Sequence, residues 1–118
     1  MEHKQYIYKA IVTKVVDGDT FDLKIDLGFD VTVKHRIRLY GVDAYETSLR
    51  GDTTEEEKRK GIEAKAFLID RIFDKEVIIE TVKDKKGKYG RYLANVCHEG
   101  KMVSEMLVEK GYVKGKRQ

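Results

Sequence analysis

Two neighbouring segments with apolar residues at every second position constrain the fold most. Apolar and charged side chains alternate from Phe21 to Leu27 and again from Val31 to Leu39, and residues 28–30 connect the two segments. A period of two places successive side chains on opposite faces of a strand. A three-residue connection that contains glycine is typical of a hairpin. The sequence therefore predicts two half-buried strands joined as one hairpin.

Three further strands are predicted around this hairpin. The segments Tyr6–Val16, Val77–Val82 and Tyr92–Cys97 are rich in β-branched, aromatic and other apolar residues. The "DGDT" stretch at residues 17–20 separates the first of these segments from the hairpin and is a turn signal.

Two helices complete the pattern. Thr54 and Glu57 match a capping box, so the longer helix is expected to begin at Thr54. Four apolar residues then recur at steps of four, three and four, which indicates one apolar helical face. A shorter amphipathic helix around residues 102–107 is expected to stop at Gly111. The four residues of the apolar face are Ile62, Ala66, Ile69 and Phe73.

The order of these elements is three strands, a helix, two strands and a helix. Five strands with a helix between the third and fourth is the arrangement of an OB-fold barrel. The predicted class is α+β, mainly β, with a short C-terminal helix. The whole chain, residues 1–118, is expected to form one domain.

Composition excludes several classes of protein. No apolar run approaches the roughly 20 residues that span a bilayer, so no membrane association is expected. Cys97 is the only cysteine, which excludes a disulfide framework and suits a reducing compartment. The N-terminal residues lack a signal-peptide pattern, so the expected location is the cytoplasm, or outside the cell if a signal segment was removed. Residues 83–91 carry five basic residues against one acidic, a distribution that suits either a solvated loop or a polyanion partner.

Carboxylates and arginines near the strand ends could carry chemistry. Asp19 and Asp43 supply oxygen ligands for a hard cation, although Asp19 could equally belong to an ordinary turn. Strand alternation puts Arg38 on the polar face, and it can share a site with Asp43 only if the chain bends at Gly41. Arg91 opens the fifth strand, and the rigid fork of arginine suits phosphate oxygens.

Five blocks of sequence together resemble the staphylococcal nuclease (thermonuclease) family. The blocks are "VVDGDTFDL", "RIRLYGVDAYET", "GIEAKAFL", "KYGRYLA" and "GKMVSEMLVEKG", and they occur in the family's order between Ala10 and Val113. The resemblance implies an OB-fold barrel and a calcium-dependent phosphodiesterase that acts on DNA and RNA and leaves 3′-phosphates. Single-stranded or loosely paired substrates and a monomeric protein are expected.

The resemblance also implies roles for individual residues. Asp19, Asp43 and the backbone carbonyl of Ala44 match the family's Ca²⁺ ligands. Where the family commonly has proline after the residue matched by Ala44, this chain has Tyr45, so the following loop is less preset. The other matched positions are the catalytic Arg38 and Arg91, which bind phosphate, the catalytic general base Glu46, and Lys88 and Tyr89, which contact the nucleotide's other phosphate.

Two other functions remain open at this point. A non-catalytic nucleic-acid-binding module could have the same fold, since fold does not fix function. The enzyme is favoured over that module because all five acidic and arginine residues of the site are present, namely Asp19, Arg38, Asp43, Glu46 and Arg91. A protein-binding OB domain would need an exposed apolar face, which the sequence alone does not identify.

Overall fold

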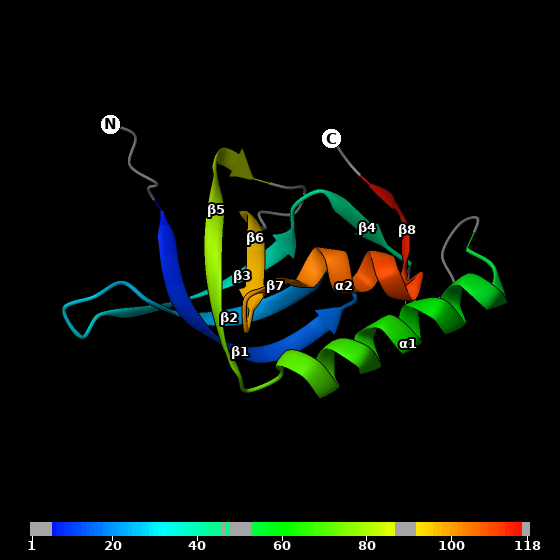
Figure 1. The fold of residues 1–118 in the computed structure, drawn as a ribbon, viewed down its shortest axis with the longest axis horizontal. Helices are drawn as coiled ribbons and strands as arrows, with labels where there is room; N and C mark the ends of the chain where they lie inside the picture. The colour runs from blue at the N-terminus through cyan, green and yellow to red at the C-terminus, as the bar shows by residue number, and fades with distance from the viewer. Residues whose placement is uncertain (1–5, 46, 48–52, 87–91, 117–118) are drawn as a thin grey trace.

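The structure is a computed structural model that describes residues 6–45, 47, 53–86 and 92–116. Five strands form a closed, mostly antiparallel barrel in the order β3-β2-β1-β5-β6 (Figure 1). Parallel pairing of β3 with β6, from Ile37 to Leu39 against Tyr92 to Ala94, closes it. The predicted five-stranded OB-like barrel is therefore confirmed. The strands are β1 (Ile7–Asp17), β2 (Thr20–Asp26), β3 (Thr32–Leu39), β5 (Glu76–Lys86) and β6 (Tyr92–His98).

Three short strands were not predicted from the sequence. β7 (Lys101–Met102) extends the sheet beyond β6, whereas β4 (Val42–Ala44) pairs with β8 (Val113–Lys116) as a separate ribbon. Each has only two to four residues, too few for an alternating pattern to be recognised. The β4–β8 ribbon bears on the candidate site because β4 carries Asp43.

The longer helix, α1 (Glu55–Ile72), begins where the capping box predicts. The Thr54 hydroxyl accepts a hydrogen bond from the Glu57 N–H at 3.1 Å, and the Glu57 carboxylate accepts one from the Thr54 N–H at 3.1 Å. The second helix, α2 (Val103–Lys110), ends at Gly111, whose φ of 74° is left-handed. Both predicted helix limits are confirmed.

The apolar face indicated for α1 is not the buried one. Ile62, Ile69 and Phe73 are 48%, 44% and 46% exposed, and Ala66 is exposed as well. The buried face consists instead of Gly61, Ala64, Leu68 and Ile72. The small residues on this face allow the helix backbone to approach the turn before β2 closely. A search for large apolar side chains at helical spacing therefore identifies an exposed face of the helix instead of the buried one.

The barrel interior and the inner faces of both helices form one core. The inward positions of β2 are Phe21, Leu23 and Ile25, as its alternation predicts. The largest fully buried side chains of the core are Phe21, Leu23, Ile37, Leu39, Leu68, Ile72, Ile79 and Leu107.

Among the described residues, no helix combines the length and apolar character needed to cross a membrane.

The β2–β3 hairpin extends beyond the closed part of the barrel, at the left of Figure 1. In the described residues β3 pairs with β6 only from Ile37 onward, so its first half has β2 alone as a strand neighbour. The tip turns through Gly28, Phe29 and Asp30, which all have positive φ. Because β2 also pairs with β1 along its length, the first half of β3 forms an edge of the sheet beside β2.

Candidate active site

The carboxylate of Asp19 is buried and held from two sides. It lies in the turn between β1 and β2, with 7% of the residue exposed. Its Oδ1 accepts a hydrogen bond from the Thr20 hydroxyl at 2.9 Å, and its Oδ2 accepts one from the Ala44 N–H at 3.1 Å. The Asp19 carbonyl also accepts the Leu39 N–H at 2.8 Å. The turn that carries Asp19 is thus tied to both β3 and β4.

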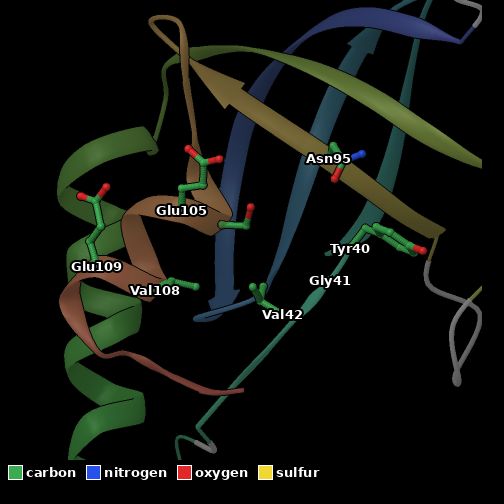
Figure 2. Close-up of a pocket in the computed structure, with 8 residues that line it drawn as sticks. Tyr40, Gly41, Val42, Asn95, Glu105, Val108 and Glu109 are labelled. Carbon is green, nitrogen blue, oxygen red and sulfur yellow. The ribbon is translucent and has the colours of Figure 1, made fainter. Parts of the chain in front are cut away.

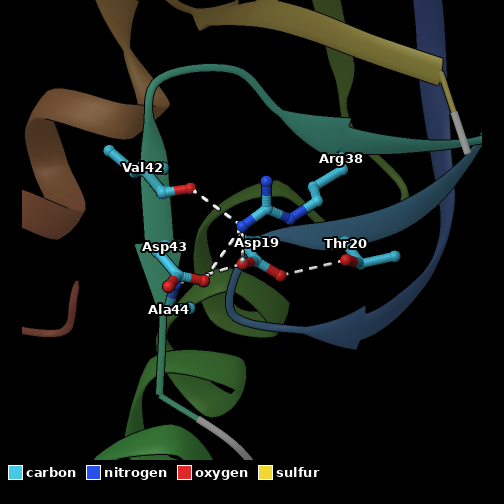
Figure 3. A network of polar contacts seen from close by, with 6 residues as sticks. All are labelled: Asp19, Thr20, Arg38, Val42, Asp43 and Ala44. Carbon is cyan, nitrogen blue, oxygen red and sulfur yellow. Dashed lines mark hydrogen bonds and ion pairs between the residues drawn. The ribbon is translucent and has the colours of Figure 1, made fainter. Parts of the chain in front are cut away.

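Arg38 lies between two carboxylates, as Figure 3 shows. Its Nη2 donates to Asp43 Oδ1 at 2.9 Å and to the Val42 carbonyl at 3.3 Å, and lies 3.4 Å from Asp19 Oδ2. Arg38 is only 8% exposed because the chain folds back over it after β3. The left-handed φ of 85° at Gly41 makes this reversal, which is the bend that a shared site requires.

The strand that bears Asp43 is fixed by contacts distant in sequence. Asp43 is paired with Gly115 of β8, and Ala44 with Val113. Beyond β4, the ammonium of Lys60 on α1 lies 5.3 Å from the centre of the Tyr45 ring, which is a cation–π geometry. The β8 ladder and this contact hold the segment where the family commonly has proline.

Asp19 and Asp43 are the type of ligand that a hard cation prefers. Asp19 and Asp43 offer oxygen atoms, which Ca²⁺ prefers, and the Asp43 side chain is 36% exposed against 10% for Asp19. Three or more His, Cys, Asp or Glu side chains do not gather as a metal-binding group anywhere in the described segments. The described residues therefore fit such an ion as a sparse two-carboxylate site, and within the described part of the chain further ligands would have to come from backbone, water or substrate.

Four of the predicted site residues cannot be placed. Glu46, Lys88, Tyr89 and Arg91 lie outside the described residues, so their roles stay predictions. The structure does bring Asp19, Arg38, Asp43 and Ala44 together, although for Ala44 it shows the N–H engaged with Asp19 rather than a role for its carbonyl.

Supporting contacts around the site were missed from the sequence. The Thr47 hydroxyl donates to Asp17 Oδ1 at 2.9 Å, linking the segment after β4 to the end of β1. Thr20 and the Val42 carbonyl also contact the central residues. The sequence signal for these contacts was the threonine that follows an acidic residue in both "DGDT" and "YET".

A cavity of about 390 Å³ lies beside β4 and α2 (Figure 2). Its lining includes Tyr40, Asn95, Val108 and the carboxylates of Glu105 and Glu109. Two glutamates repel a phosphate, so this cavity is a poor candidate for the binding of a polyanion. The cluster around Arg38 remains the candidate active site.

Comparison with known proteins identifies the family. A family model described as "Staphylococcal nuclease homologue" matches residues 36–117, most of the chain. The chain belongs to the staphylococcal nuclease family. The match includes Arg38 and Asp43, and similarity to two individual relatives extends over about nine tenths of the chain.

Two relatives of the chain have names that state an activity. Over 109 residues the chain is 36% identical to Endonuclease YhcR of Bacillus subtilis (strain 168), covering 89% of this chain and 9% of the relative. Over 106 residues it is 33% identical to Thermonuclease of Staphylococcus intermedius, covering 90% of this chain and 58% of the relative. The chain thus spans less than a tenth of the first relative and somewhat more than half of the second.

Proposed function

We propose that this chain is a calcium-dependent nuclease that hydrolyses phosphodiester bonds of DNA and RNA and leaves 3′-phosphates. One observation carries the proposal: the guanidinium of Arg38 is held between the carboxylates of Asp19 and Asp43 at one end of the barrel. The relatives named Endonuclease YhcR and Thermonuclease support nuclease chemistry.

The orientation of Arg38 suits it to bind a phosphate. All its hydrogen bonds and ion pairs with described residues go through Nη2. Nε and Nη1 take part in none of these contacts, which leaves their N–H groups available to a ligand. The carboxylates fix the guanidinium through Nη2, and the other N–H groups of such a fork can bind two phosphate oxygens.

Asp19 and Asp43, with the carbonyl of Ala44, would hold Ca²⁺ next to this fork. The bound ion would neutralise charge on a phosphoryl oxygen and help to orient the attacking water. Arg38 Nη2 lies 3.4 Å from Asp19 Oδ2 and 2.9 Å from Asp43 Oδ1, so an ion held by these carboxylates would be close enough to the guanidinium for one phosphate to contact both the ion and Arg38.

The remaining steps belong to residues outside the described part of the chain. Arg91 would be the second phosphate-binding arginine and would stabilise the charge that builds up in the transition state. Glu46 would accept the proton of the attacking water. Lys88 and Tyr89 would contact the other phosphate of the nucleotide. A monomeric protein acting on single-stranded or loosely paired substrate is part of the same proposal.

A cleavage assay on matched single-stranded DNA and RNA oligonucleotides tests the proposal. Cleavage is expected with Ca²⁺ and not in excess chelator, and the products should shift in mobility after a 3′-phosphatase treatment. Full activity in chelator would overturn the metal dependence. Binding of the oligonucleotide without any cleavage would favour the alternative, a non-catalytic nucleic-acid-binding module.

A pair of variants on one strand separates the role of Arg38 from a general effect of charge. Arg38→Lys keeps the charge and loses the fork, so kcat should fall by about 10²-fold or more, roughly 3 kcal/mol. Arg36→Lys is the matched control: Arg36 lies two positions away on the same face of β3 and is held by Asp22. Its activity should stay within about twofold of the parent. Equal losses in both variants would contradict the assignment of Arg38.

A further inference from the structure

The outer face of the β2–β3 hairpin carries charged residues in cross-strand rows that lead away from Arg38. Phe21, Leu23 and Ile25 of β2 point into the core, so the alternate residues of β2 and their partners on β3 point outward. From the site toward the hairpin tip, the outward pairs are Thr20–Arg38, Asp22–Arg36, Lys24–Lys34 and Asp26–Thr32.

The charge of Arg36 is compensated within its own row. Its Nε and Nη2 donate to the two carboxylate oxygens of Asp22 at 2.7 and 3.2 Å. These hydrogen bonds and the negative charge of the Asp22 carboxylate raise the pKa of Arg36. Arg36 therefore has little net charge to offer a ligand.

The next row is different because it places two lysines directly opposite each other. Lys24 and Lys34 are cross-strand partners, and both are exposed. Among the described residues neither ammonium group forms an ion pair. Like charges at directly opposed positions destabilise a sheet, and an anion between the two ammonium groups would remove that repulsion.

The position of this row suits a nucleic acid strand whose scissile phosphate is at Arg38. Lys34 is four residues from Arg38 on the same strand and the same face, or roughly 13 Å at about 3.3 Å per residue. That distance corresponds to about four stacked nucleotides at about 3.4 Å each, and to fewer when the strand is extended. The two sites can therefore bind different phosphates of one strand.

We propose that Lys24 and Lys34 form a second phosphate-binding subsite, which binds single-stranded nucleic acid several nucleotides from the bond that is cut. The proposal rests on the proposed nuclease function. It predicts that substrate length matters: an oligonucleotide long enough to reach the lysine row is bound more tightly than one that occupies the Arg38 site alone.

Kinetics with substrates of two lengths test the subsite. The double variant Lys24→Gln/Lys34→Gln should raise the KM for a 15-nucleotide single strand roughly fivefold, with kcat unchanged and the KM for a dinucleotide substrate unchanged. The salt dependence of binding to the long strand should weaken by about 1.4 in slope, the value for two lost contacts to a single strand. The control is Lys101→Gln/Lys110→Gln, two exposed lysines on β7 and at the end of α2, which removes the same charge and should change neither quantity.

Two further measurements make the outcome decisive. The Lys24→Gln/Lys34→Gln variant should unfold at the same or a higher urea concentration than the parent, because it removes a repulsive pair. Lys24→Arg/Lys34→Arg should keep the parental KM. An unchanged KM for the long strand, or an equal rise in the control variant, would overturn the subsite. If no substrate is cleaved, the nuclease proposal fails, and anisotropy of a labelled 15-nucleotide strand still decides whether the two lysines bind it.

Discussion

The close approach of α1 to the turn before β2 gives a prediction whose size follows from the geometry. A methyl group at Gly18 would lie 2.8 Å from Cβ of Ala64 on α1 and 3.1 Å from Cβ of Ala44 on β4. Carbon atoms in contact prefer about 3.5–4.0 Å, so the helix and the strand would both have to move outward by several tenths of an ångström. Overpacking of this kind costs about 1–3 kcal/mol, and Gly18→Ala should lower the free energy of unfolding by that amount.

The same variant should also affect the site. Ala44, which must move, donates the 3.1 Å hydrogen bond to Asp19 Oδ2. A shift of several tenths of an ångström brings that bond to the limit of useful geometry. Nuclease activity per folded molecule is therefore expected to fall as well, although Gly18 contacts no substrate.

Urea unfolding followed by circular dichroism measures the effect, and a second variant tests its cause. Ala64→Gly alone should cost about 0.5–1 kcal/mol because glycine is a poor helix residue. In Gly18→Ala/Ala64→Gly the shortest contact is gone. The double variant should therefore lose less free energy of unfolding than the two single variants lose together, by about 1 kcal/mol or more. A loss below about 0.5 kcal/mol for Gly18→Ala, or strict additivity in the double variant, would refute the reasoning.

Three other predictions use single contacts. Thr54→Ala removes the capping side chain of α1 and should cost about 0.5–2 kcal/mol in urea unfolding, with Thr54→Ser close to the parent. Leu68→Ala should cost about 2–5 kcal/mol because Leu68 is fully buried, whereas Ile69→Ala should cost well under half as much; equal losses would contradict the observed burial of the helix. Asp43→Asn should weaken Ca²⁺ binding measured by calorimetry, and should lower the unfolding midpoint in chelator because it removes a charge paired with the buried Arg38; unchanged Ca²⁺ affinity would exclude Asp43 as a ligand.

Elements with a local signal were predictable from the sequence. The β2–β3 hairpin follows from strict alternation, and the start of α1 follows from two side chains three residues apart that bond each other's backbone. The buried face of α1 was not predictable in this way. Its packing depends on small residues meeting Gly18, and the absence of a side chain gives no periodic apolar signal.

The candidate site was predictable in its residues more than in its geometry. Alternation along β3 alone would separate Arg38 from Asp43, and only the left-handed turn at Gly41 brings them to 2.9 Å. The β4–β8 ribbon gave no signal, because it joins two very short strands about seventy residues apart in the chain. Long-range pairing of this kind is set by the assembled barrel and not by the local sequence.

The β4–β8 pairing also sets an order of assembly during protein synthesis. A nascent chain leaves the ribosome from its N-terminus, so Asp43 emerges well before Val113–Lys116, the strand that pairs with its own. Until those residues have been added, β4 lacks its strand partner, and the pairing of Asp43 with Gly115 cannot form. The candidate site is thus completed only after residues 113–116 have been synthesised.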